Sequence, residues 1–161
     1  MNTEYFFCVM LIYMIVNLIT DTLTLKTKNI WHLFMAIVIM ITCMLNKTLL
    51  ITIASVSLVL IIWMVMSKMI PVNLGAGDLK MLMIITSFQQ IIYQPNNFSF
   101  LVLVTFGLYI VLSFIQFIFI KVIKDLKRKE ITFFAYRTEG NVIIRPESLP
   151  ILLTVIILHS F

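Results

Sequence analysis

The sequence predicts an all-α membrane protein, a polytopic bundle of about six transmembrane helices in a single domain, 1–161. Hydrophobic residues make up 61% of the chain and charged residues only 12%, whereas soluble domains carry about 25% charged residues. The mean hydropathy is +1.09. The apolar residues are also gathered into long runs, and a helix needs about 20 such residues to cross the roughly 30 Å hydrocarbon core of a bilayer.

Six apolar runs account for the expected helices in order, and they lie at about 4–20, 31–46, 48–67, 79–94, 98–121 and 149–161. At about 1.5 Å per residue the fourth run spans about 24 Å and the fifth about 36 Å, so the fifth is expected to tilt. The last run covers only about 20 Å and is expected to stop short of the far surface or to thin the bilayer. The first run lacks the flanking features of a cleavable signal peptide, so it is expected to be a span.

Basic residues orient the bundle, because Lys and Arg in short loops stay on the cytoplasmic side. Placing alternate loops inside puts each of the 12 cations except Lys47 on one side. We therefore expect a multi-pass protein of the cytoplasmic membrane, with both termini outside and the loops near 21–30, 68–78 and 122–148 inside. The basic run "KVIKDLKRKE" is expected to contact anionic lipid of the bilayer and not nucleic acid.

Two of the seven acidic residues, Asp21 and Asp78, fall at helix ends on this cytoplasmic side. Asp21 follows the first apolar run, in a stretch that reads well as a solvated loop, and Asp78 stands in "NLGAGDLKM". As a structural residue, Asp78 would be the N-cap of a helix that begins at Leu79. A cap does not explain Gly75 and Gly77, which would permit positive φ and the close approach of another chain.

Two carboxyl groups within hydrogen-bonding range cannot both ionise cheaply, so they share one proton. One can then act as a base toward water and the other as an acid, which is the machinery of an aspartic protease. Such a pair uses neither a metal nor a cofactor, and none is expected. His32 and His159 have no acid or cysteine at ligand spacing, and Cys8 and Cys43 lie in apolar runs without a CxxC motif.

The segment "GAGDLK", 75–80, resembles the GxGDxK motif of the type IV prepilin peptidase family, the bacterial branch of the GxGD intramembrane aspartyl proteases. That family typically carries an Asp at the cytoplasmic end of its first catalytic-domain helix, followed by a short basic loop that ends in Ile-Pro-Asn. Here "DTLTLKTKN", 21–29, has the Asp and the Asn, with Thr27 and Lys28 in place of Ile-Pro. The resemblance covers the whole chain as a six-helix catalytic domain.

The resemblance implies an aspartic endopeptidase that cleaves the leader from type IV prepilin-like or pseudopilin precursors at the cytoplasmic face. Asp21 and Asp78 would form the catalytic dyad, and Gly75 and Gly77 would give the catalytic loop its close approach. The implied partners are the precursor protein and the lipid bilayer. The CxxC-bearing region of the larger bifunctional members does not occur in this sequence, so methyltransferase activity is not expected.

Two further residues match the motifs and are given supporting roles. Asn29 is expected to cap the second helix. Lys80 either biases the shared proton by its positive charge or extends to the lipid headgroups. Because a helix dipole favours an anion at the N-terminus, Asp78 is expected to be the ionised member of the dyad, with the proton on Asp21.

Three other functions fit part of the pattern. A signal-peptide-peptidase-like enzyme would cut deeper inside helices, but its usual Tyr-Asp motif is missing from this sequence. A small membrane transporter or channel subunit would use Asp21 and Asp78 as a proton or cation site. A noncatalytic scaffold for pilus assembly would tolerate the loss of either acid.

Overall fold

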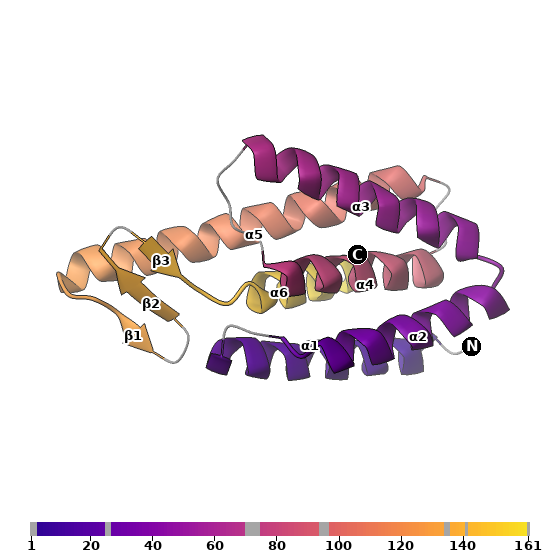
Figure 1. Cartoon of the computed structure of the whole chain (residues 1–161), viewed down its shortest axis with the longest axis horizontal. Coiled ribbons are helices and arrows are strands. Elements are labelled where there is room, and N and C mark those ends of the chain that lie inside the picture. The colour runs from indigo at the N-terminus through magenta and orange to yellow at the C-terminus, as the bar shows by residue number, and fades with distance from the viewer. Residues whose placement is uncertain are drawn as a thin grey trace.

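The computed structural model of the chain describes residues 3–24, 27–69, 75–93, 97–133, 136–140 and 142–160. Within these ranges the chain forms six helices and one small sheet (Figure 1). The expected bundle of helices is confirmed, because each helix overlaps one of the six apolar runs. The helices are α1 (Thr3–Thr24), α2 (Asn29–Leu45), α3 (Leu49–Met69), α4 (Ala76–Tyr93), α5 (Phe98–Lys127) and α6 (Ser148–Ser160).

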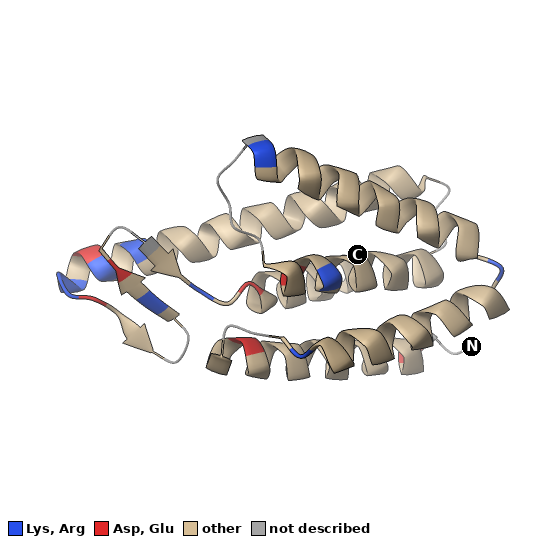
Figure 2. Cartoon of the chain, in the orientation of Figure 1, with Lys and Arg blue, Asp and Glu red and all other residues tan. Residues whose placement is uncertain are grey.

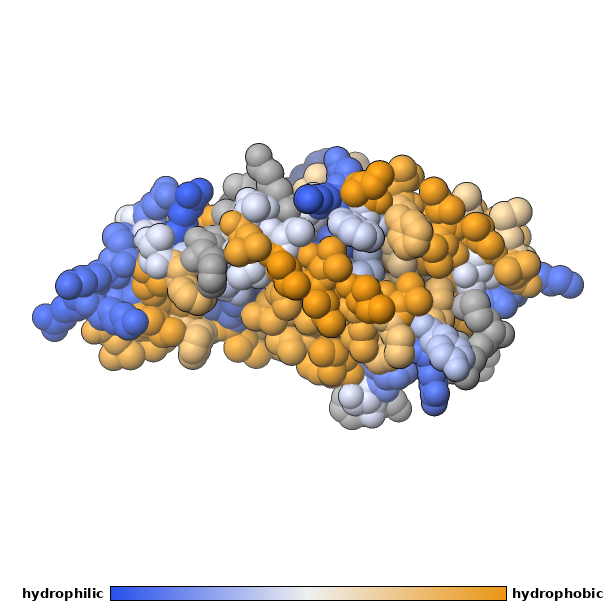
Figure 3. All heavy atoms as spheres, turned by 90° about the horizontal axis from the view of Figure 1, so that it is seen from below, coloured by the Kyte–Doolittle hydropathy of each residue, from blue (hydrophilic) through white to orange (hydrophobic). Residues whose placement is uncertain are grey.

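Three of these helices are long and apolar enough to cross a membrane, judged by length and composition. The spans lie at Glu4–Thr24 in α1, Leu49–Lys68 in α3 and Phe98–Lys127 in α5. The helices α2 and α6 are also apolar but shorter. The outer surface agrees with a lipid environment, because large apolar side chains such as Leu33, Leu50 and Phe119 are exposed. Figure 3 shows such an apolar surface over the middle of the molecule, with hydrophilic residues gathered at the left end.

The helix α4 lies at the centre of the bundle. In Figure 1, α4 and α6 lie between the pair α1 and α2 on one side and the pair α3 and α5 on the other. Residues 81–91 of α4 are buried almost without interruption. This enclosure explains why α4 can carry Gln89 and Gln90, since its surroundings are other helices. Thr105 of α5 donates a hydrogen bond of 2.6 Å to Oε1 of Gln89.

The helix ends that carry Asp21 and Asp78 lie at the same end of the bundle, together with most of the described basic residues (Figure 2). Lys47 lies at the opposite end, between α2 and α3. This arrangement follows from the chain reversing direction at each helix, so that every second connection returns to the same end. Lys26, which was counted among the residues of that end, lies outside the described residues.

The sheet was not predicted from the sequence. Residues 122–148 were expected to form a loop. It consists of β1 (Thr132–Phe133), β2 (Tyr136–Glu139) and β3 (Val142–Ile144), antiparallel in the order β1-β2-β3. Thr138 is buried and its Oγ1 accepts a hydrogen bond of 2.9 Å from the backbone N–H of Ile131. Lys124, near the end of α5, donates a hydrogen bond to the carbonyl of Gly140 and pairs with Glu130 at 3.6 Å. These contacts fasten the sheet to α5.

Candidate active site

Asp21 lies near the C-terminal end of α1 and is only 5% exposed. Its Oδ2 accepts a hydrogen bond of 3.0 Å from the backbone N–H of Ser148, the first residue of α6. The first N–H groups of a helix have no partner within the helix. Asp21 therefore caps α6 across 127 residues of sequence, and its charge is favourable at this helix N-terminus.

Asp78 also takes part in helix capping, although differently from the expected way. The helix α4 begins at Ala76 and not at Leu79, so Asp78 is its third residue. Asp78 Oδ2 accepts a hydrogen bond of 3.0 Å from the backbone N–H of Gly75, which precedes the helix. This is the backward bond of a capping box, in which the third helical side chain reaches the N–H of the cap residue.

The structure brings the two aspartates into electrostatic contact. Asp78 precedes the apolar run of its helix and lies outside the three segments long enough to span a membrane. Burial raises the pKa of Asp78 to about 7, and the nearby carboxyl groups of Asp21 and Glu147 add to the rise. A carboxyl group with a pKa near neutrality can hold or release a proton under physiological conditions, as general acid–base catalysis needs.

Glu147 is a third acidic residue at this site, and the sequence reasoning did not single it out. Its Oε2 accepts hydrogen bonds from Ser113 Oγ at 2.8 Å and from Tyr109 Oη at 3.2 Å, both on α5. Its Oε1 accepts a bond of 2.8 Å from Nε of Arg145. Glu147 stands next to Ser148, so these bonds hold the N-terminus of α6 beside Asp21. The sequence does hold a signal that could have identified Glu147. It is an acid directly before the last apolar run, at the end of the bundle where Asp21 and Asp78 are expected.

The sheet contributes Tyr136 to the same region. Gln116 of α5 donates hydrogen bonds to Tyr136 Oη at 3.0 Å and to the carbonyl of Pro146 at 3.2 Å. Burial raises the pKa of Tyr136, and the negative charges of Asp21 and Glu147 raise it further. Tyr136 of the sheet is therefore within electrostatic range of both carboxyl groups.

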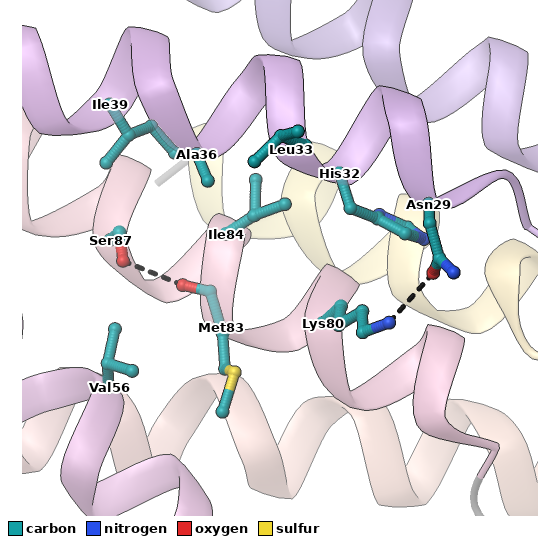
Figure 4. Close-up of a pocket in the computed structure, with 10 residues that line it drawn as sticks. All are labelled: Asn29, His32, Leu33, Ala36, Ile39, Val56, Lys80, Met83, Ile84 and Ser87. Carbon is teal, nitrogen blue, oxygen red and sulfur yellow. Dashed lines mark hydrogen bonds between the residues drawn. The ribbon is translucent and has the colours of Figure 1, made fainter.

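Asn29 and Lys80 are joined to each other. The predicted cap role of Asn29 is wrong, because the N-cap of α2 is Lys28, which makes no side-chain cap bond. Asn29 Oδ1 instead accepts a hydrogen bond of 2.8 Å from Lys80 Nζ (Figure 4). Residues two apart on a helix point about 200° apart, so Lys80 lies on the face of α4 away from Asp78. This placement favours a role in joining α2 to α4 over an electrostatic role at the dyad.

The two glycines of the motif are closely packed but lack the positive φ that was expected. Neither has a positive φ, because Gly140 is the only glycine with that conformation among the described residues. A Cβ on Gly77 would lie 2.4 Å from Thr27 Oγ1, and a Cβ on Gly75 would lie 2.9 Å from Asp78 Oδ2. The chain that approaches Gly77 is therefore the protein's own connection between α1 and α2.

Thr27 is fixed in that position by a buried histidine. Thr27 Oγ1 is hydrogen-bonded to His32 Nε2 at 2.7 Å, and Tyr13 Oη is hydrogen-bonded to His32 Nδ1 at 2.6 Å. Both ring nitrogens are thus engaged, and His32 is only 4% exposed. Tyr13, His32 and Thr27 together tie α1, α2 and the connection between them to the start of α4.

Comparisons of this chain with family models, with curated proteins and with solved structures found no match. The resemblance therefore stands on the residues of "GAGDLK" and "DTLTLKTKN" themselves. Within the described part of the chain, no group of three or more His, Cys, Asp or Glu side chains is arranged to hold a metal ion.

The packing of Gly77 against Thr27 gives the first prediction. Gly77→Ala should lower the free energy of unfolding by about 1–3 kcal/mol, because the added methyl group overlaps the Thr27 hydroxyl that His32 holds in place. The matched control is Gly107→Ala on α5, where a Cβ meets nothing within 4 Å. Thermal unfolding in detergent should show a lower melting temperature for Gly77→Ala alone. Equal melting temperatures for the two variants would show that the contact is not tight.

Proposed function

We propose that this protein is an aspartic endopeptidase of the cytoplasmic membrane, which removes the leader from type IV prepilin-like or pseudopilin precursors. The observation that carries the proposal is the electrostatic coupling of Asp21 and Asp78 at one end of the bundle, where burial and the charge of Asp21 help to raise the pKa of Asp78 to about 7. Two carboxyl groups that share one proton can activate water directly. The GxGDxK resemblance supplies the substrate class.

The proposed reaction uses Asp21 as the base and Asp78 as the acid. Asp21 takes a proton from a water molecule while the water oxygen attacks the peptide carbonyl carbon, and protonated Asp78 gives its proton to the carbonyl oxygen. The tetrahedral intermediate then breaks at the C–N bond. The proton on Asp21 passes to the leaving amine, and one hydroxyl of the intermediate returns its proton to Asp78 as the carbonyl re-forms. No covalent bond to the enzyme forms at any step.

This mechanism reverses the expected location of the shared proton. The helix dipole argument alone favoured an ionised Asp78, but two negative neighbours, Asp21 and Glu147, disfavour its charge. Asp21 is proposed as the ionised member, because the N–H of Ser148 at the start of α6 stabilises its negative charge.

The charge of the site fits the proposed substrate. Three carboxyl groups, from Asp21, Asp78 and Glu147, lie near one another, and Arg145 is paired with Glu147. A net negative site attracts a cationic peptide, and the leaders cleaved by the family are basic. The site also lies at the end of the bundle that the positive-inside rule assigns to the cytoplasm.

Substituting the dyad tests the proposal. Asp21→Asn and Asp78→Asn should each reduce cleavage of a co-expressed prepilin-like precursor at least about 100-fold, because general acid–base catalysis contributes about 10²–10⁴-fold. Asp125→Asn is the control, because Asp125 is an exposed acid on the last turns of α5. Precursor and mature protein are separated by gel mobility and quantified by immunoblot.

The outcomes separate the candidate functions. Maturation by both dyad variants at the wild-type rate would exclude the dyad. An intact precursor with the wild-type protein, together with proton or cation flux that both Asn variants abolish, would favour the transporter or channel function. Wild-type pilus assembly by both variants without any cleavage would favour the scaffold.

The charge of Glu147 gives a prediction on pH. Activity that needs protonated Asp78 is lost as the pH rises through the pKa of that group, which is about 7. Glu147→Gln removes a negative neighbour, so the pKa of Asp78 falls and activity should be lost at a lower pH than in the wild type. Asp125→Asn, which changes an exposed acid on the last turns of α5, should leave the profile unchanged. Initial rates on a precursor peptide across the neutral range measure the shift. Overlapping profiles would remove Glu147 from the electrostatics of the site.

The orientation is tested by labelling single cysteines in a Cys8→Ser, Cys43→Ser background. A membrane-impermeant maleimide should label Lys47→Cys in intact cells and Lys127→Cys only after the membrane is opened. Both lysines are exposed and lie at opposite ends of the bundle (Figure 2). Labelling of Lys127→Cys in intact cells would place the carboxyl groups outside the cell.

A further inference from the structure

A cavity of about 430 Å³ lies between α2, α3 and α4 (Figure 4). The helices α2 and α3 each pack mainly against α4 and only sparsely against each other, so α4 forms the floor of a groove and the other two helices form its walls. The cavity is within the size range of small-molecule sites, about 300–1,000 Å³. Its lining residues are Asn29, His32, Leu33, Ala36, Ile39, Val56, Lys80, Met83, Ile84 and Ser87.

The groove is apolar along its length and polar at one end only. Leu33 and Ala36 of the α2 wall are exposed on the outer surface of the bundle, where lipid is expected. The hydroxyl of Ser87 is already satisfied by a hydrogen bond of 2.8 Å to the carbonyl of Met83. The polar end is formed by Asn29 and Lys80, which lie at the end of the bundle that holds Asp21 (Figure 4). This is the polarity of a site for an amphiphile.

The polar end carries uncompensated positive charge. Lys80 lines the groove, Lys28 directly precedes the lining residue Asn29, and Lys68, in the last turn of α3, lies outside the lining residues. All three are exposed. In the part of the chain that the structure describes, none of these three lysines pairs with a carboxylate. The bond to Asn29 occupies one donor of the Lys80 ammonium group, and a lysine has three. Two donors of Lys80 therefore remain for an anion.

Charge and position together select the occupant. Lys80 in the groove and Lys28 beside Asn29 attract an anionic headgroup and repel the basic leader of the proposed substrate. The groove also lies on the face of α4 away from Asp78, because its α4 residues, Lys80, Met83, Ile84 and Ser87, share one side of the helix. A precursor in the groove would thus have its cleavage site on the wrong side of α4.

We propose that the groove between α2 and α3 binds one anionic phospholipid, with an acyl chain along Leu33, Ala36 and Ile84 and the phosphate at Lys80. The site is separate from the carboxyl groups and does not depend on peptidase activity. Asp78→Asn should therefore bind the lipid as the wild type does.

The test is a titration of the detergent-purified protein with palmitoyl-oleoyl phosphatidylglycerol or phosphatidylcholine, followed by native mass spectrometry. The wild type should bind the first phosphatidylglycerol at least about fivefold more tightly than phosphatidylcholine, since one lysine near an anionic lipid contributes roughly that factor. Lys80→Gln should remove this preference. Lys47→Gln, at the other end of the bundle, is its control.

A second pair of variants tests the groove itself. Ala36→Phe fills the groove and should abolish tight binding of both lipids, whereas Ile37→Phe adds bulk to the exposed surface of the same helix outside the lining residues. Ile37→Phe should leave lipid binding at the wild-type level and shows that α2 tolerates a larger side chain. Thermal unfolding checks that both variants are folded.

Several results would overturn the proposal. Equal affinity for the two lipids would exclude recognition of an anionic headgroup. Equal loss of the preference in Lys47→Gln and Lys80→Gln would show that it reflects only the net charge of the protein. Undiminished phosphatidylglycerol binding by folded Ala36→Phe would exclude the groove. Binding of a precursor's apolar peptide that Ala36→Phe blocks, while lipid binding persists, would assign the groove to the substrate instead.

Discussion

The hydrogen bond from Ser148 N–H to Asp21 Oδ2 is the contact on which the site depends. It joins the end of α1 to the start of α6, so the first and last helices of the chain must meet at the same depth. The carboxylate of Asp21 is fixed by this bond, and Glu147 is carried in beside it. With Asp78 on α4 repelled by both charges, three helices that are distant in sequence present their acidic groups to one point.

The central position of α4 reconciles its polar sequence with an apolar bundle. Thr86, Ser87, Gln89 and Gln90 are buried among other helices, and the large apolar side chains of the outer helices form the exterior. The first turn of α4 meets a different demand. Gly77 lets Thr27 approach within a distance that no side chain would allow, and Lys80 reaches Asn29. The GAGDLK segment is therefore a packing junction as well as the carrier of Asp78.

The sequence predicted the features that arise from long local patterns. Six apolar runs gave six helices, and the alternation of direction placed Asp21 and Asp78 at the same end. The features that it missed arise from contacts between distant residues or from very short elements. Nothing local marks Ser148 as the partner of Asp21 or Lys80 as the partner of Asn29. The strands β1, β2 and β3 have two to four residues each, too few for a pattern with a period of two residues to stand out.

The length of α5 determines the direction in which the sheet faces. At about 1.5 Å per residue its 30 residues extend about 45 Å, which exceeds the roughly 30 Å core of a bilayer. The last turns of α5 carry the sheet, and β2 brings Tyr136 back toward Asp21. Because each helical residue also rotates the chain by about 100°, inserting or deleting a single residue in this overhang would swing the sheet around the helix axis. The number of residues in α5 thus sets the direction in which the sheet points around the helix axis. After such a change, nearly a full turn of added helix would be needed to restore that direction.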